Sequence, residues 1–264
     1  MPFIRKPFFV VPLDLGSVSG SAVAGHPASN LNRFDAMALT WQGSGGGTVS
    51  GNFGASREVD FCAILAANAA PGTTVRVQVG SYDSGAVPFI APAVTRKSGL
   101  YSSHIEFPSV QTSSSWSVTV SHSGTFEAPF LVLGKKIEPS RYWDVDIEFG
   151  IEDTAKGEFT RLGIFDREDG VLLRTVEFVL SWQTEEEFET KFRPMVEELG
   201  QTRFAFLSFD PEPTTYRQNR TYFGRLSKPG FATGKRMPRR FGQEFKILSA
   251  VSYTHLTLPT IYSV

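Results

Sequence analysis

The stretch Thr74-Val-Arg-Val-Gln-Val79 alternates apolar and polar residues without a break. Successive side chains of a β-strand point to opposite faces, so the three valines of this stretch share one face. The segment Trp116-Ser-Val-Thr-Val120 repeats the same spacing further along the chain. Both segments are therefore predicted to be β-strands with one apolar face.

Short runs rich in β-branched and aromatic residues recur between turn residues throughout the first 138 positions. This arrangement is typical of an all-β sandwich or barrel. Turns or loops are expected at the glycine-rich Gly43–Gly47 and at Ala70–Gly72, and no helical periodicity of useful length precedes residue 138. The other predicted strands are Phe8–Leu13, Val59–Leu65, Ser102–Phe107, Trp116–Ser121 and Phe130–Leu133.

The second part of the chain combines strands with one strong helix. Thr184-Glu-Glu-Glu187 has the pattern of a capping box, in which Thr184 accepts from a backbone N–H and Glu187 reaches back to the cap. Gly200 should end the helix, and Pro194 should kink or split it. An apolar stripe at helical spacing supports the helix and consists of Phe188, Phe192, Met195, Val196 and Leu199.

The order of elements in this part predicts an α+β unit, with one helix plugging a small sheet or barrel. A charged hairpin turn is expected at Asp166–Gly170, which ends in Asp-Gly. The predicted strands are Trp143–Phe149, Arg161–Phe165, Val171–Trp182, Thr202–Phe209, Arg220–Leu226 and Phe241–Leu248.

The distribution of charge indicates where the chain divides. The 264 residues have a net charge of −1 and 20% charged residues, which excludes disorder and collagen-like repetition. Residues 1–138 carry 17 charged side chains, whereas residues 139–249 carry 36, so a domain boundary is expected near Lys135–Pro139. No run of eighteen apolar residues exists, so no membrane span is expected.

The second part also has halves of opposite charge. Residues 139–202 hold seven basic and sixteen acidic residues, whereas residues 203–249 hold ten basic and three acidic residues. Such halves could steer head-to-tail stacking of subunits or bind nucleic acid. The nearly neutral total favours protein assembly, so no nucleic-acid partner is expected.

The residues that most often build metal and disulfide sites are sparse. Cys62 is the single cysteine and lies in the apolar run Val59–Leu65, which indicates a buried thiol in a chain assembled in a reducing cytoplasm. His26, His104 and His122 lack the spacing of a zinc site. Neither a metal nor another cofactor is expected.

Two further patterns resemble ligand sites. Asp144, Asp146 and Glu148 alternate along a predicted strand and could bind a divalent cation, although a solvated outer face explains them better. The glycine-rich segment Gly43–Gly51 lacks the lysine and following helix of a phosphate-binding loop. No nucleophile–base set or carboxylate pair with a recognisable context emerges, so no catalytic residue is assigned and the chain is not expected to be an enzyme.

The last fifteen residues, Ala250–Val264, contain no Asp, Glu, Lys or Arg. Their sequence resembles the conceptual translation of a transposon-end sequencing adapter. We therefore expect residues 250–264 to be foreign to the fold and exclude them from it.

Residues 1–138 resemble galactose-binding-like jelly rolls of the discoidin type. In that family a first strand leads through a polar loop to a core tryptophan, and a late pair of strands closes the sandwich. The corresponding segments here are Ala28–Asp35, Thr40-Trp41, Val59–Asn68, Trp116–Val120 and Phe130–Gly134. The resemblance implies that a glycan would be bound at loops Asn30–Asp35 and Asn68–Gly72, with Trp41 in the core.

The arrangement of a jelly roll (1–138) followed by an α+β unit (139–249) resembles tail or virion structural proteins of tailed bacteriophages and prophages. The segments that carry this resemblance are Leu133–Ile137, Thr184–Phe188, Thr202–Pro211 and Tyr222–Leu226. It implies a non-enzymatic, homo-oligomeric component of a tail tip, baseplate or distal-tail region, assembled in the bacterial cytoplasm and located in the virion. Its partners would be other tail proteins and a host glycan. The alternative is a lectin-like carbohydrate-binding protein.

Overall fold

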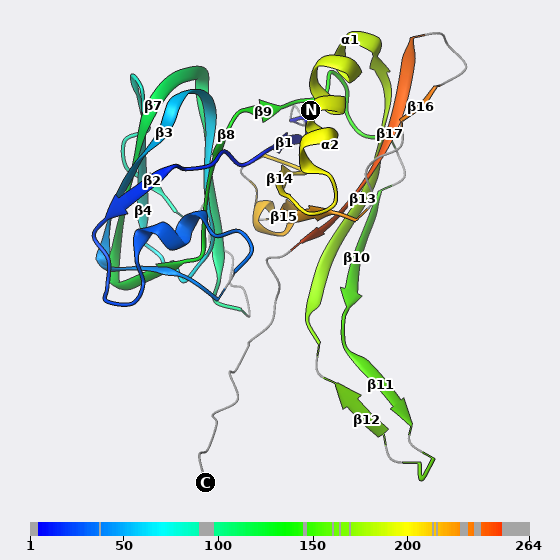
Figure 1. The fold of residues 1–264 in the computed structure, drawn as a ribbon, viewed down its shortest axis with the longest axis horizontal. Helices are drawn as coiled ribbons and strands as arrows, with labels where there is room; N and C mark the ends of the chain where they lie inside the picture. The colour runs from blue at the N-terminus through cyan, green and yellow to red at the C-terminus, as the bar shows by residue number, and fades with distance from the viewer. Residues whose placement is uncertain are drawn as a thin grey trace.

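The computed structural model shows a mainly β protein with two lobes and a projecting arm (Figure 1). The predicted fold class is confirmed: a β-sandwich stands beside a sheet that carries one helical segment. Among the described residues, no helix is long and apolar enough to cross a membrane. The expected foreign tail, residues 250–264, lies outside the described residues, which are 5–36, 38–89, 98–144, 147–159, 161–163, 165–168, 170–212, 214, 216–227, 232–234 and 239–249.

The sandwich is built around two very long strands, β3 (Trp41–Ala67) and β7 (Tyr101–Ala128), which pair with each other through several register shifts. The strand order is β2-β3-β7-β4-β5, with β6 on β4 and β8 on β3. The remaining bounds are β2 Ser17–Gly20, β4 Thr74–Val79, β5 Tyr82–Asp83, β6 Val87–Pro88 and β8 Phe130–Gly134, with a 3-10 turn η1 at Ala28–Asn32.

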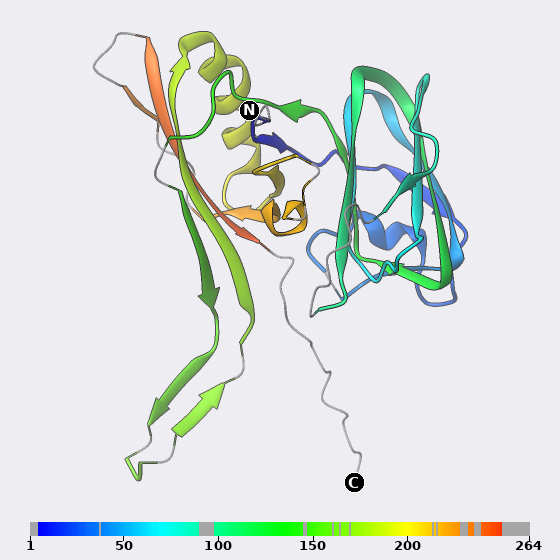
Figure 2. The same cartoon turned by 180° about the vertical axis from the view of Figure 1, so that it is seen from behind.

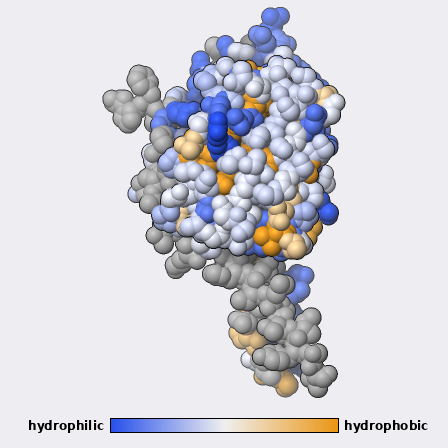
Figure 3. Space-filling model, turned by 90° about the vertical axis from the view of Figure 1, so that its left-hand side faces the viewer, coloured by the Kyte–Doolittle hydropathy of each residue, from blue (hydrophilic) through white to orange (hydrophobic). Residues whose placement is uncertain are grey.

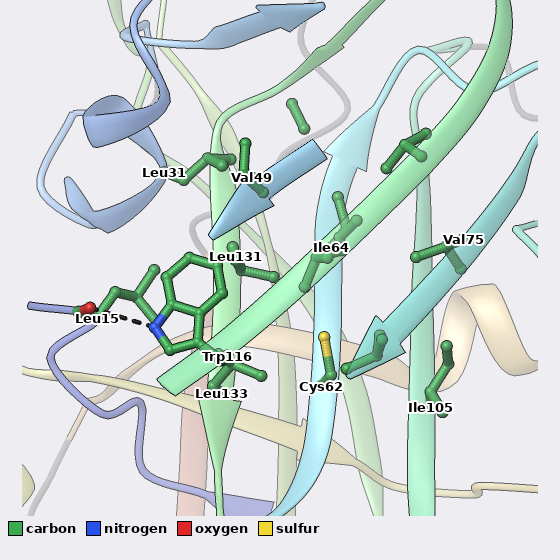
Figure 4. Close-up of a cluster of buried hydrophobic side chains, with 14 of the residues drawn as sticks. Leu15, Leu31, Val49, Cys62, Ile64, Val75, Ile105, Trp116, Leu131 and Leu133 are labelled. Carbon is green, nitrogen blue, oxygen red and sulfur yellow. Dashed lines mark hydrogen bonds between the residues drawn. The ribbon is translucent and has the colours of Figure 1, made fainter. Parts of the chain in front are cut away.

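The alternation seen in the sequence corresponds to β4, whose bounds match the predicted Thr74–Val79. Val77 lies opposite Val118 of β7, and both side chains are 0% exposed. Figure 4 shows the core of the sandwich, where the Trp116 indole N–H donates to the Leu15 carbonyl over 3.3 Å. Cys62 lies in the same cluster and is 1% exposed, so the prediction of a buried thiol is confirmed.

The glycine-rich segment is not a turn, contrary to expectation. Gly43–Gly47 lies inside β3, where the pairing with β7 shifts between Ser44 and Gly46. Gly45 and Gly46 have φ of 71° and 88°, a region that favours glycine, so the strand bends there without ending. The expected turn at Ala70–Gly72 is present, closed by a 3.1 Å bond from the Thr73 N–H to the Ala70 carbonyl.

The second sheet has the order β10-β13-β17-β15-β14-β1-β9, with β16 paired to β17. Its first strand in the chain, β1, pairs with β14 and β9, so the predicted opening strand of the jelly roll lies in the other lobe. Two short strands from residues 1–138, β1 and β9, therefore belong to the sheet of the second lobe. The bounds are β1 Phe8–Val10, β9 Lys136–Ile137, β10 Glu148–Asp153, β13 Leu172–Thr184, β14 Phe204–Ser208, β15 Thr221–Leu226, β16 Ala232–Gly234 and β17 Arg240–Ser249.

The buried residues of β1 contribute to two different cores, one on each face of the second sheet. Phe9 joins the core beneath the helix, whereas Phe8 and Val10 join a second core shared with the sandwich. In that shared core, the rings of Phe61 from β3 and Phe206 from β14 have centroids 4.6 Å apart. Apolar packing, a strong and non-directional source of stability, therefore holds the two lobes together.

The predicted helix is present and interrupted as expected. It comprises α1 (Glu185–Glu187), a π-helical turn η2 (Phe188–Phe192) and α2 (Arg193–Leu199), with Pro194 at the start of α2. Proline has no backbone N–H to donate, which suits the first turn of a new helical segment. Gly200 ends α2 with φ of 52°, as predicted.

Only half of the predicted capping box forms. The Thr184 hydroxyl accepts from the Glu187 N–H over 3.1 Å, as expected. The Glu187 carboxylate does not return to the cap and instead accepts from the N–H and hydroxyl of Ser140 over 2.5 and 2.6 Å. Glu187 is 6% exposed, so its carboxylate ties the helix start to the chain that leaves the sandwich.

A two-stranded arm extends from the end of the second sheet, as Figure 2 shows from behind. Its outer strands are β11 (Lys156–Phe159) and β12 (Phe165–Glu168). Residues 161–163 form the turn at its tip, so the strand predicted at Arg161–Phe165 and the turn predicted at Asp166–Gly170 are wrong. Apolar side chains of the arm are exposed to solvent. Their spacing in the sequence therefore does not mark a buried face, which is why these two predictions failed.

Candidate functional site

A groove lies between the sandwich and the helical lobe, and we call it the interlobe groove. Its volume is about 630 Å³, which is within the usual size of small-ligand pockets. The sandwich contributes η1, the chain before β2 and part of β3, while the other lobe contributes the end of α2 and the start of β14. The lining residues are Val11, Pro12, Leu13, Asp14, Asn32, Phe34, Asp35, Phe53, Arg57, Glu198, Thr202, Arg203 and Phe204.

Asp14 and Asn32 form a fixed polar unit in the interlobe groove. Asp14 Oδ1 accepts from the Gly16 N–H over 2.9 Å and from Asn32 Nδ2 over 2.8 Å. These two hydrogen bonds, with a smaller contribution from the positive charge of Arg57, lower the pKa of Asp14 below its ordinary value. Asn32 also accepts from the Leu15 N–H over 3.3 Å, so its orientation is set from two sides.

A second carboxylate, Asp35, lies on the exposed rim. Arg33 donates to it over 3.3 Å, and this hydrogen bond is the main cause of its lowered pKa. On the opposite wall, Arg203 donates to Glu198 over 3.0 Å. The interlobe groove therefore presents carboxylates, a carboxamide and guanidinium groups, which together accept and donate hydrogen bonds.

Aromatic rings form the apolar part of the same groove. Phe53 is 8% exposed and packs beside Trp116, with ring centroids 6.4 Å apart. Phe34 and Phe204 are partly exposed and both contact Phe223 in the core between the lobes. A few fixed polar groups beside apolar rings are what a site for a partly polar ligand requires.

One of the two loops predicted to bind a glycan lines the interlobe groove, and the other does not. The Asn30–Asp35 loop supplies Asn32, Phe34 and Asp35 to the interlobe groove. The Asn68–Gly72 loop does not line the groove. The Asn68 side chain instead donates to the Thr125 carbonyl and accepts from the Glu127 N–H within the sandwich. Sequence reasoning missed Asp14, Phe53, Arg57, Glu198 and Arg203, which are brought together only by the packing of the lobes.

The remaining candidate residues that the structure describes do not line the interlobe groove. Trp41 is 1% exposed and donates to the Ser21 carbonyl over 2.8 Å, so the expected core position is confirmed. Of the three alternating carboxylates, Asp146 lies outside the described residues. Within the part of the chain that the structure describes, no three His, Cys, Asp or Glu side chains gather as a metal site.

Comparisons with solved structures find carbohydrate-binding modules that resemble about half of the chain. The family 32 module of C. perfringens NanJ, solved with galactose, is 17% identical with a TM-score of 0.36, covering 48% of this chain and 99% of the module. Chitosan-binding module 1 of a Paenibacillus sp. chitosanase/glucanase is 15% identical with a TM-score of 0.34, at 47% and 97% coverage. The module of AlyQ, solved with 4,5-unsaturated mannuronic acid, is 15% identical with a TM-score of 0.33, at 46% and 96% coverage.

No family profile matches the chain, and no curated protein matches it.

Proposed function

We propose that this chain is a non-enzymatic protein that binds a carbohydrate in the interlobe groove. The observation that carries the proposal is the placement of the Asp14–Asn32 unit and Asp35 beside the Phe34 and Phe53 rings. Sugar hydroxyls donate to and accept from such planar side chains, while the apolar face of a sugar ring packs against an aromatic ring. Glycans therefore match both kinds of surface in this groove.

The charge states of Asp14 and Asp35 support binding rather than an acid role for either carboxylate. Glycoside hydrolases need one carboxylic acid that keeps its proton near neutral pH, so its pKa must be raised. Asp14 and Asp35 both have lowered pKa values because of the hydrogen bonds that they accept. Both are ionised near neutral pH, and neither is suited to protonate a leaving group.

A glycan array followed by calorimetry tests this proposal. Galactose, chitosan oligosaccharides and unsaturated mannuronic acid, which are named for the structural neighbours, serve as the first probes alongside the array. We expect Arg57→Ala and Asp35→Asn to weaken binding at least about tenfold, the effect of losing one hydrogen bond to a charged group. The matched control is Arg76→Ala, an exposed sandwich arginine outside the groove lining. No binding to any probe, or equal affinity of all variants, would contradict the proposal.

A second candidate function is a structural component of a phage tail or virion. It is supported by the arm, which carries large apolar side chains into solvent: Phe159 is 74% exposed and Leu162 is 86% exposed. Soluble proteins rarely leave such surfaces uncovered unless another molecule binds there. Antibody labelling of purified virions tests this candidate. The expected result is detection of the chain in the particle. Absence of the chain from intact particles would contradict this candidate.

A further inference from the structure

A polar contact joins the two lobes beside the aromatic core that they share. It is made by η3 (Arg217–Arg220) of the helical lobe and the start of β7 in the sandwich. The Ser102 N–H donates to Gln218 Oε1 over 3.0 Å, and Gln218 Nε2 donates to the Ser102 carbonyl. Arg217 donates to Nε2 of His104 over 3.0 Å and to the His104 carbonyl over 3.4 Å. We call these four hydrogen bonds the interlobe latch.

The interlobe latch fixes the protonation state of His104. An arginine side chain only donates hydrogen bonds, so Nε2 of the imidazole must be the acceptor. A neutral imidazole has one acceptor nitrogen, and Nδ1 therefore carries the hydrogen. A further proton would go to Nε2, where the new N–H would point at the N–H of Arg217. Protonation of His104 and its side-chain hydrogen bond with Arg217 are therefore mutually exclusive.

The charged groups around His104 oppose its protonation. The positive groups that face it are Arg217 of η3, Arg5 before β1 and Lys136 of β9. Burial, followed by these positive charges, keeps the pKa of His104 well below its ordinary value. Glu106, on the same strand, is already paired with Arg5 over 2.5 Å and with Lys136 over 3.1 Å. A proton on His104 would therefore add a fourth positive charge to the three that face it.

Other charged groups lie one step further from the imidazole. Strand β14, which packs on the imidazole, carries no charged side chain. The remaining carboxylates of this cluster each lie beside one of the cations: Asp60 and Glu138 beside Lys136, and Glu212 beside Arg217. His104 is therefore the group whose protonation acts directly on the interlobe latch.

A small cavity adjoins His104 at the interlobe latch. Its volume is about 60 Å³, and its lining includes Ser102, Ser103 and His104 of β7 with Arg217 and Gln218 of η3. One water takes roughly 30 Å³ in the liquid, so the cavity has room for water beside the imidazole. Water in this cavity would bring a proton to His104 while the latch is still closed.

The aromatic core beneath the interlobe latch has no titrating group toward its other end. The rings of Phe8, Phe61 and Phe206 have centroids 6.3, 5.7 and 5.6 Å from that of the imidazole. Two residues before Phe206 on β14, Phe204 packs on Phe223 at 5.5 Å and lines the interlobe groove. Figure 3 faces the side of the sandwich that points away from the helical lobe, and most of this surface is white to blue. Release of the latch would therefore expose rings of a kind that the outward face shows only in scattered patches.

We propose that protonation of His104 opens the interlobe latch and releases η3 from β7. The aromatic contacts near the interlobe groove stay in place, so the opening is local. Because the open form binds the extra proton, its population grows by up to about tenfold for each pH unit below about 6.5. Above that pH the opening equilibrium does not change with pH. This device does not depend on a glycan in the interlobe groove.

Amide hydrogen exchange of the whole chain, resolved by residue with NMR, tests this proposal from about pH 8 to about pH 4.5. Each rate is divided by the intrinsic exchange rate at the same pH, which gives a protection factor. The protection factor of the Ser102 N–H should be constant above about pH 6.5 and fall by up to about tenfold per pH unit below it. Val118 of the sandwich and Phe245 of the helical lobe, both 0% exposed, should keep their protection.

Three variants separate His104 from other titrating groups. His104→Gln keeps an acceptor for Arg217 and takes up no proton, so its Ser102 protection should not vary with pH. His122→Gln is the matched control, because His122 bonds Thr73 within the sandwich, and it should keep the wild-type profile. Arg217→Gln removes the donor and the main positive charge, so its Ser102 protection should be at least about tenfold lower at neutral pH and should vary less with pH.

Four outcomes would overturn the proposal. The first is wild-type protection at Ser102 that stays constant down to about pH 4.5. The second is a wild-type pH profile in His104→Gln, and the third is wild-type protection at neutral pH in Arg217→Gln. The fourth is a joint loss of protection at Ser102, Val118 and Phe245, which would show unfolding of the whole protein in place of a local release.

Discussion

The Arg217 guanidinium donates to Nε2 of His104 over 3.0 Å, so η3 of the helical lobe is joined to β7 of the sandwich. His104 is 8% exposed and packs against Phe8, Phe61 and Phe206, the aromatic core between the lobes. Because its Nε2 accepts this hydrogen bond, the imidazole is neutral at that atom. Burial, followed by the positive charges of Arg217, Arg5 and Lys136, keeps the pKa of His104 well below its ordinary value.

This pairing predicts that the protein loses stability in mild acid. In the unfolded chain His104 takes up a proton near pH 6.5, whereas the folded protein resists protonation. Its contribution is thus complete above that pH and declines below it, by at most about 1.4 kcal/mol per pH unit. His104→Gln keeps an acceptor for Arg217 and removes the titration, so urea unfolding between about pH 4.5 and 6.5 should show a shallower slope. An unchanged slope would show that other groups control the pH dependence.

The proposed binding of a glycan in the interlobe groove should be nearly independent of pH in the neutral range. The pKa of Asp14 lies below its ordinary value of 3.8, mainly because of the Gly16 N–H and the Asn32 amide. The carboxylate therefore keeps its charge between about pH 5 and 8. Calorimetric titrations with the best array ligand should give one affinity over this range. A tenfold change in affinity would point to a different titrating group in the site.

Substitution of Thr184 or Glu187, at the start of the helical segment, should lower the free energy of unfolding. Thr184→Ala removes the N-cap acceptor of the Glu187 N–H and should cost about 1 kcal/mol. Glu187→Ala leaves the Ser140 N–H without its partner and should cost roughly 2 to 3 kcal/mol. Glu186→Ala, at an exposed neighbouring position, should change the free energy of unfolding by less than about 0.5 kcal/mol. Equal effects at all three positions would argue against these roles.

Gly51 should tolerate no side chain. A Cβ atom built there would lie 2.5 Å from the Trp116 ring, which fills the core and cannot move aside easily. Gly51→Ala should therefore lower the free energy of unfolding by about 1 to 3 kcal/mol. Gly234→Ala is the matched control, because no atom of the described residues lies within 4 Å of its Cβ position. Similar stability of the two variants would refute the close packing at Gly51.

Cys62 should be unreactive while the protein is folded. Burial raises the pKa of its thiol far above the ordinary value, and the thiolate is the reactive form. Modification by a thiol reagent should be slow in buffer and rapid in denaturant. Fast modification of the native protein would reveal an opening of β3 that exposes the sandwich core.

Several features of this protein were determined by the sequence alone, because they depend on residues close together in the chain. The alternation of Thr74–Val79 predicted β4. Thr184 and Gly200 marked the two ends of the helical segment, since both act on backbone groups within one turn. The apolar run around Cys62 indicated a buried strand.

Other features were decided only by tertiary structure. The three residues of β1 would suit either sheet, because Phe8, Phe9 and Val10 are all apolar. Only the pairing with β14 assigns them to the helical lobe. The interlobe groove combines Asp14 and Arg57 with Arg203, which lies far away in the chain, so no local pattern could reveal it. The exposed aromatic residues of the arm resemble a core strand in composition. Periodicity reports that side chains share a face, but what covers that face depends on the packing of distant segments.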